Sequence, residues 1–485
     1  MVFSSLIFLY AFLPLSLLVY VLCKGREAKN VSLLVFSLIF YAWGEPKYVL
    51  LLMFMSLCSW FCALRVERAA SRKGKRAWVA VSCAIDIALI GFFKYAGLIC
   101  SVFGEVPEFI ANIALPIGIS FYTFQLLTYV VDVYRGDAEA QPSYLNVLLY
   151  ASLFHQCVAG PIVRYKTIAH ELFVQRDSRD LLSGISRFTV GLAKKTLLAN
   201  PCGALADQLL LSTDAASNAS LFAENLSTLS GLSALGAWMG VAAFMMQIYL
   251  DFSAYSDMAI GMGRMLGLHY LENFDYPYLS KTVTEFWRRW HISLGTFFRD
   301  YVYIPLGGRQ CSKARSVLNL FVVWALTGLW HGAHWNFVLW GLYFFVFILI
   351  ERLFLKRLFA KLHILPHIYL LFVVFVGWIL FHFTDVRLGW TVFLGLFGAN
   401  GNAASDFVSI TLLKNNVFLL AVSAIACTPL VKTMANGAGT RLRRSRSGER
   451  LFNLMAYIVF PIILLLLSTA SLVGDSYNPF IYFQF

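Results

Sequence analysis

Long apolar segments recur along most of this chain and constrain its fold more than any other feature of the sequence. The first occupies residues 2–22, and comparable segments follow at 48–64 and 78–103. About 20 apolar residues are needed for a helix to cross the hydrocarbon core of a bilayer. Within lipid every backbone polar group must be paired internally, so helices are the expected form of such segments. The sequence predicts an all-α, polytopic transmembrane bundle.

The composition supports this prediction and excludes an ordinary soluble protein. Hydrophobic residues make up 59% of the 485 residues and charged residues 13%, whereas soluble domains contain about 25% charged residues. The net charge of +13 does not indicate nucleic-acid binding, because Lys and Arg cluster in loops between apolar segments, as in cytoplasmic loops of membrane proteins. We expect a single integral-membrane domain over residues 1–485, with the first apolar segment retained as a span.

The basic residues also predict the orientation of the chain. Basic loops at 24–29, 65–76 and 441–450 are expected in the cytoplasm, which places the N-terminus and the tail at 473–485 outside. Lys194 and Lys195 indicate another cytoplasmic helix end. Residues 178–226 are more polar and do not predict helix boundaries, and 386–414 are expected to be largely external. Further spans are expected at 31–43, 115–134, 236–252, 368–383, 417–430 and 451–473.

No metal site is expected. The nine cysteines lie mostly within apolar runs without metal or redox spacing, which favours packing roles. Asp251 and Asp257 are six residues apart, so they do not share one helix face closely.

The segment 285–340 contains the strongest functional signal, three histidines among tryptophans and glycines. His331 lies in an apolar run with basic residues on both sides, so both ends of that run are expected in the cytoplasm and the chain must enter and return. Residues 316–330 would span roughly 22 Å of helix, short of the bilayer core of about 30 Å. The turn at 330–332 is therefore expected within the membrane, where an ionisable residue commonly marks a functional site.

The alternative for His331 is a neutral imidazole that only hydrogen-bonds a carbonyl between helices. Gly328 and Gly332, which permit close backbone approach, and His291 beside paired arginines favour the functional interpretation. His334 is expected to be a packing or hydrogen-bonding residue.

Several motifs, in order along the chain, resemble the membrane-bound O-acyltransferase superfamily, and more closely its bacterial alginate O-acetylases. Peptidoglycan O-acetyltransferases and the D-alanyl transferase of teichoic acids are relatives of that branch. One departure is His155, where the family pattern has proline; it bears on local helix geometry. The motifs are LPIGISFYTFQ (115–125), VAGPIVRY (158–165), YLDFSAYSDMAIG (249–261), ENFDYPY (272–278), EFWRRWHISLGTFFRDYVYIPLGG (285–308), LTGLWHGAHWNFVLWG (326–341) and the terminal SYNPFIYFQF.

The resemblance implies a ring of helices with a thin centre and re-entrant helices. A central tunnel would join a cytoplasmic and an outer funnel beside the histidine of the Trp-His-Gly motif, which is His331 here. The second family histidine corresponds to His291. The implied activity is transfer of an acetyl or other acyl group from a cytoplasmic thioester donor such as acetyl-CoA, with no bound cofactor.

The last six residues read F-x-Y-x-x-F. They resemble the C-terminal motif of the small peptide that works beside the teichoic acid D-alanyl transferase, whose tyrosine is the acyl carrier. Tyr482 would take that role here. An aromatic anchor at the membrane interface is the alternative.

The mechanism implied by these residues is general-base catalysis by His331, with His291 orienting or polarising the thioester. Arg288 and Arg289 suit donor phosphates or, alternatively, anchor the cytoplasmic side; Trp290 and Trp330 complete the donor site.

From Tyr482 the acyl group would pass to an extracytoplasmic partner of the SGNH type, with a serine nucleophile, and then to a polysaccharide outside the bacterial cytoplasmic membrane, an exopolysaccharide or peptidoglycan. D-alanyl transfer to teichoic acid is the nearest alternative. A transporter would tend to show inverted repeats, and none stands out in the sequence.

Overall fold

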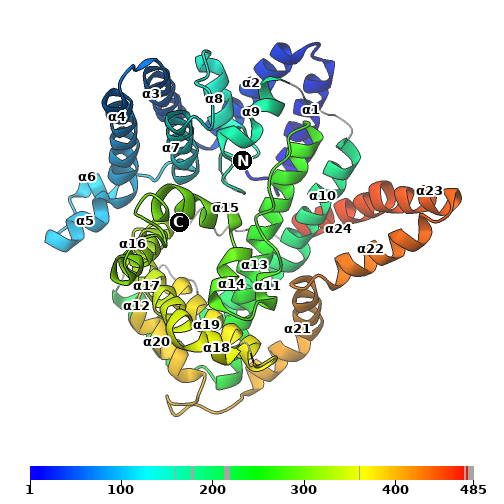
Figure 1. Ribbon diagram of the computed structural model, residues 1–485. Helices are drawn as coiled ribbons and strands as arrows, with labels where there is room; N and C mark the ends of the chain where they lie inside the picture. The colour runs from blue at the N-terminus through cyan, green and yellow to red at the C-terminus, as the bar shows by residue number, and fades with distance from the viewer. Residues whose placement is uncertain are drawn as a thin grey trace. The chain divides into compact units, whose positions relative to one another are not determined.

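The computed structural model describes residues 1–158, 160–174, 176, 180–211, 219–359, 361–474 and 477–478. Over this part of the chain the regular structure is helical, without a β-strand (Figure 1). The prediction of an all-α protein is therefore confirmed.

The chain divides into two compact units. Unit 1 contains Met1–Leu192, Tyr255–Glu272 and Met455–Val473, and unit 2 contains Ala193–Ala254, Asn273–Leu454 and Gly474–Phe485. The 32-residue helix α13 (Ala234–Met265) contributes to both. It covers the span expected at 236–252 and the polar motif that follows in one continuous helix.

In unit 1, α3 packs against α4, α7 and α8, and α2 packs against α8. The main helices are α1 (Leu13–Leu22), α2 (Arg26–Gly44), α3 (Val49–Arg68), α4 (Arg72–Ile90), α5 (Ala96–Phe103), α7 (Ile119–Arg135), α8 (Tyr144–Ser152), α9 (Tyr165–Phe173), α10 (Leu181–Ala193) and α24 (Phe460–Gly474).

In unit 2, a hairpin of α16 (Lys313–His331) and α17 (Trp335–Ile350) packs on α19 (Leu365–His382). The remaining main helices are α11 (Asn200–Leu210), α12 (Ala219–Ser230), α14 (Val283–Arg289), α15 (Ile292–Phe297), α20 (Val386–Gly395), α21 (Phe407–Ala426), α22 (Leu430–Leu442) and α23 (Arg446–Leu454).

The α16–α17 hairpin depends on small residues at its interface. A Cβ at Gly328 would lie 2.4 Å from the Phe337 carbonyl oxygen, and one at Gly341 would lie 2.4 Å from the Trp324 carbonyl oxygen. Small residues allow helices in membrane proteins to approach this closely. The expectation that Gly328 permits close backbone approach is confirmed.

Seven segments among the described residues are long and apolar enough to cross a membrane, in agreement with a polytopic protein. They are Val49–Arg68, Arg72–Phe103, Ala234–Met265, Trp335–Leu355, Leu365–His382, Phe407–Ala426 and Arg446–Gly474. The first expected span forms a shorter apolar helical stretch, Phe8–Leu22. The spans expected at 31–43 and 115–134 form α2 and α7, which are not among the seven.

The boundary expected at residue 417 is wrong. The span expected at 417–430 begins ten residues earlier, at Phe407, within the region expected to be largely external. The cause is a side-chain cap, because the Asp406 carboxylate accepts hydrogen bonds from the Ser409 amide (2.8 Å) and hydroxyl (2.8 Å). Such a cap satisfies backbone donors at a helix start, so Lys414 lies within the helix and not in a loop.

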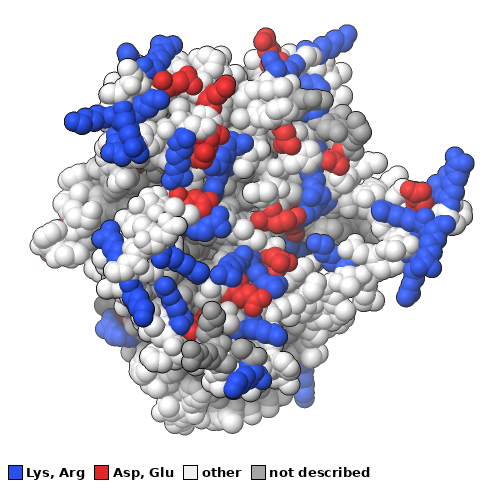
Figure 2. Space-filling view, in the orientation of Figure 1, with Lys and Arg blue, Asp and Glu red and all other residues white. Residues whose placement is uncertain are grey.

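Basic side chains gather where α22 and α23 meet (Figure 2). Arg441, Arg443, Arg444 and Arg446 are all exposed there, which agrees with the basic loop expected at 441–450.

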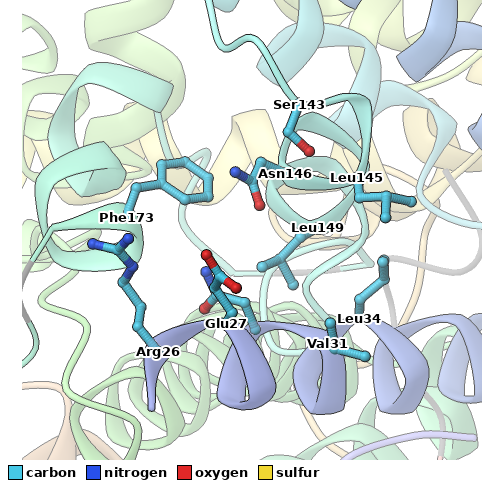
Figure 3. A pocket seen from close by; sticks show the side chains of 10 residues that line it. Arg26, Glu27, Val31, Leu34, Ser143, Leu145, Asn146, Leu149 and Phe173 are labelled. Atoms are coloured by element: carbon cyan, nitrogen blue, oxygen red, sulfur yellow. The ribbon is translucent and has the colours of Figure 1, made fainter.

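A pocket of about 330 Å³ opens in unit 1 (Figure 3). Arg26 and Glu27 of α2 and Ser143 and Asn146 at the start of α8 give it a polar side, and Leu149 contributes to its apolar wall. None of the predicted site residues lines it.

Candidate active site

His331 is the last residue of α16, directly before the turn into α17. The chain therefore reverses at residues 332–334, two positions after the turn predicted at 330–332, and His331 is helical rather than part of the turn. The His331 side chain is buried and packs against three aromatic rings at steep angles: Trp330 (centroids 4.8 Å apart), Trp340 (4.8 Å) and Phe381 (5.3 Å). Such low-dielectric surroundings strengthen electrostatic interactions with any reacting group. That this turn lies within the bilayer stays a prediction.

His291 is held in an unusual backbone conformation at the start of α15. Its φ of 45° and ψ of 55° are left-handed, which costs a residue with a side chain on the order of 1–2 kcal/mol. The imidazole is buried and its ring lies 4.7 Å from that of Phe252 on α13. Backbone outliers of this kind cluster at functional sites, so this conformation marks His291 independently of its motif.

Asn273 fixes the tautomer of His291. The side-chain oxygen of Asn273 accepts hydrogen bonds from the Ser293 amide (3.2 Å) and hydroxyl (2.9 Å), and it lies 3.3 Å from His291 Nδ1. A backbone N–H can only donate, so the atom facing it must be the amide oxygen. The Ser293 hydroxyl also lies 3.3 Å from His291 Nδ1, but its proton is donated to Asn273. Both oxygens near Nδ1 are therefore acceptors, which favours a proton on Nδ1, and in the neutral imidazole Nε2 keeps the lone pair.

Trp330 brings the two histidines into one site. Its ring lies 5.5 Å from that of His291 and 4.8 Å from that of His331. Trp290 is also buried, and packs 4.9 Å from Trp378. Residues 40 positions apart in the sequence therefore contact the same indole.

The paired arginines differ in their surroundings. Arg289 forms ion pairs with Glu285 (2.8 Å) and, more weakly, with Asp275 (3.7 Å). Arg288 is exposed, and among the described residues it has no ion-pair partner. Of the two, Arg288 is the better placed to bind an anionic group.

His334 differs from the expectation of a packing or hydrogen-bonding residue. It precedes α17 as the N-cap and is exposed, without a side-chain cap hydrogen bond.

The prediction that Lys194 and Lys195 mark a cytoplasmic helix end is wrong for Lys195. Its ammonium group is buried in unit 2 and lies 2.9 Å from the Asp251 carboxylate, which is buried as well. Lys194 donates to the Ser253 hydroxyl at 2.9 Å. A buried charge requires such a partner, and α13 supplies it.

Asp257 pairs instead with Arg187 in unit 1 (2.6 Å). Each carboxylate of the motif thus has its own cation. In the part of the chain that the structure describes, no cluster of His, Cys, Asp or Glu has the arrangement of a metal site.

Tyr482 lies outside the described residues. Asn273, in contrast, was missed by sequence reasoning although it lies in the motif at 272–278; its only signal was a polar residue between Glu272 and an aromatic run.

Comparison with known proteins identifies the family. Residues 137–393 match the model of the MBOAT, membrane-bound O-acyltransferase family. A probable alginate O-acetylase, AlgI, of Azotobacter vinelandii is 33% identical over the full length of both chains. A peptidoglycan O-acetyltransferase of Helicobacter pylori is 30% identical over 83% of this chain and 80% of the relative.

A teichoic acid D-alanyltransferase of Bacillus subtilis is more distant, 26% identical over 48% of this chain and 58% of the relative. The family model covers more than half of the chain, and the alginate O-acetylase similarity covers all of it. The chain therefore belongs to the membrane-bound O-acyltransferase family and is an acyltransferase with several membrane-spanning helices.

Proposed function

We propose that this enzyme transfers an acetyl group from a cytoplasmic thioester, acetyl-CoA, to the outside of a bacterial cytoplasmic membrane, where a polysaccharide is O-acetylated. The observation that carries the proposal is the contact of His291 and His331 with one indole, that of Trp330. The full-length similarity to probable alginate O-acetylases favours acetyl and an exopolysaccharide over other acyl groups and polymers.

His331 acts as the general base in this proposal. It removes the proton of the acceptor hydroxyl, that of Tyr482, while the hydroxyl oxygen attacks the thioester carbonyl. The tetrahedral intermediate then collapses with loss of the thiolate, which takes the proton from His331 and leaves as the free thiol. General-base assistance of this kind contributes about 10²–10⁴-fold.

His291 orients the thioester. Its Nδ1–H is directed to Asn273, so the neutral ring offers only a lone pair at Nε2. A lone pair has no proton to donate, so it cannot polarise the thioester carbonyl. Of the two roles expected for His291, orientation is therefore the better supported.

The donor is bound from the cytoplasmic side. Arg288, with Arg289 beside it, contacts donor phosphates, since guanidinium groups suit them, and Trp290 and Trp330 line the path of the thioester. No resident cofactor takes part.

The remaining steps take place outside. The acyl group passes from Tyr482 to an SGNH-type partner with a serine nucleophile and then to the polymer. This scheme requires the N-terminus and the tail outside, a tunnel through the thin centre of a helical ring, and one catalytic domain over residues 1–485.

The test uses the full-length enzyme in membranes supplied with isotopically labelled acetyl-CoA. Mass spectrometry of the C-terminal peptide should find labelled acetyl on Tyr482, and His331→Ala should abolish it, while His334→Ala, an exposed histidine three residues away, retains it. If Tyr482→Phe leaves the ester content of the polymer unchanged, the tail is structural and the carrier role is wrong. A D-alanyl group on Tyr482 would favour the teichoic acid alternative.

A further inference from the structure

The described end of the chain is bound to α11 by specific hydrogen bonds within unit 2. The Tyr477 hydroxyl donates to the Asp207 carboxylate at 2.5 Å. The Asn200 amide donates to the Tyr477 carbonyl (3.1 Å) and lies 3.3 Å from the Asn478 side-chain oxygen. Both the side chain and the backbone of the tail are therefore held at this point.

Tyr477 and Gln247 can both approach α11 closely because residue 203 is a glycine. A Cβ there would lie 2.4 Å from the Gln247 amide nitrogen and 2.9 Å from the Tyr477 hydroxyl. No larger residue fits without moving the tail or Gln247, a buried residue of α13. We call Asn200, Gly203, Asp207 and Gln247 the tail clamp.

The tail clamp is close to the histidine site along α13. Gln247 and Phe252 are five residues apart, about 7.5 Å along the helix axis, and the Phe252 ring packs on His291 at 4.7 Å. An extended chain covers about 3.3–3.6 Å per residue, so the five residues from Tyr477 to Tyr482 can span up to about 17 Å. The reach of the chain beyond Tyr477 is therefore roughly twice the length of α13 that separates Gln247 from Phe252.

We propose that the tail clamp is a positioning site for the acyl carrier, with Tyr477 and Asp207 as its positioning residues. This inference rests on the proposed function of Tyr482. Holding the chain at Tyr477 shortens the tether of Tyr482 to five residues, which limits the volume that the acceptor hydroxyl searches for the thioester. The clamp takes no part in the covalent step; it sets how often Tyr482 occupies the site.

The experiment measures acetylation of Tyr482 in the full-length enzyme during a single turnover with saturating acetyl-CoA. Tyr477→Phe and Asp207→Ala should each slow it about 10- to 100-fold, the effect expected from losing a partly buried hydrogen bond to a charged group. The double variant should be no slower than either single variant, since both remove the same interaction. Asp207→Asn keeps an acceptor oxygen and should restore most of the rate.

A second readout separates positioning from general damage. Carboxypeptidase should trim the tail of the wild type slowly beyond Tyr477 and trim both variants faster, with the melting temperature of the detergent-solubilised protein unchanged. Glu224→Ala is the matched control, because Glu224 is an exposed carboxylate on α12 in the same unit. If the Asp207→Ala protein fails to accumulate in the membrane, the test rests on Tyr477→Phe. That variant removes only one oxygen atom and is the less disruptive of the two.

The outcomes distinguish the two proposals. If Tyr482→Phe retains full transfer to the polymer, the carrier role fails and the clamp with it. If Tyr482→Phe is inactive but Tyr477→Phe matches the wild type in acetylation rate and trimming, the carrier role stands and the tail clamp is refuted.

Discussion

Asn273→Ala should inactivate the enzyme without removing either histidine. The substitution deletes the one oxygen that faces the amide and the hydroxyl of Ser293 and the Nδ1 atom of His291. Each net hydrogen bond contributes about 0.5–1.5 kcal/mol, so roughly 2–4 kcal/mol of support for the left-handed conformation of His291 disappears. The imidazole is then free to change tautomer and to rotate.

The expected effect on activity follows from the geometry. A displacement of about 1 Å at a reacting group costs on the order of 10²-fold in rate, and we expect a loss of that size in Tyr482 acetylation. Ser293→Ala is the milder comparison. It removes one donor to the same oxygen and the hydroxyl that lies 3.3 Å from His291 Nδ1, but it leaves the Asn273–His291 contact in place. Its loss should stay within several-fold.

Asn273→Asp tests the tautomer argument directly. A carboxylate also accepts from Nδ1, so the orientation of His291 is kept, but its charge favours the imidazolium and raises the pKa of His291. If the neutral ring is required, the activity of the Asp variant should fall on the acid side at a higher pH than that of the wild type.

The assay compares initial rates of labelled acetyl transfer in membrane vesicles between pH 5.5 and 8.5, normalised to the amount of enzyme, with His291→Ala measured in parallel. Should Asn273→Ala keep more than a third of the wild-type rate while His291→Ala is inactive, Asn273 does not hold His291 in its active form. Should both remain active, His291 has no part in the reaction.

Three further predictions concern the hairpin, a loop and the donor. Gly328→Ala should destabilise the protein by about 1–3 kcal/mol, because the new Cβ would lie 2.4 Å from the Phe337 carbonyl oxygen. Gly437→Ala on α22 is the control, since a Cβ there would have no atom within 4 Å. Thermal unfolding in detergent should show a lower Tm for Gly328→Ala alone. Hydrogen bonds to Asp180 and, less strongly, to Glu171 raise the pKa of His269 above 6.5. The stability that its ion pairs contribute is therefore fully present below pH 6.5 and is lost as the pH rises through the raised pKa. His269→Gln should lower the Tm at pH 6 and much less at pH 9, and an equal loss at both pH values would contradict the ion pairing. Arg288→Ala should raise the acetyl-CoA concentration for half-maximal rate about 10-fold or more. An acetyl-pantetheine donor, which has no phosphates, should be used equally well by the wild type and the variant. If the variant loses rate equally with both donors, phosphate recognition by Arg288 is excluded.

The architecture of this protein follows in large part from its sequence alone. Apolar length and the placement of basic residues are local properties, and they predicted an all-α membrane protein and a chain reversal at residues 330–332. The α16–α17 hairpin was predictable for the same reason, because its turn, its glycines and its flanking charges lie within one segment.

Only the tertiary structure decided which distant residues meet. No local pattern shows that Asp251 receives the buried charge of Lys195, that Asn273 sets the tautomer of His291, or that Asp207 binds Tyr477. Each of these pairs joins residues on different helices or loops. Hydrophobic periodicity determines which face of a helix is buried, but the partner of a buried polar group depends on how helices far apart in the sequence pack, because the cost of burying that group is met only by the atom that packing places beside it.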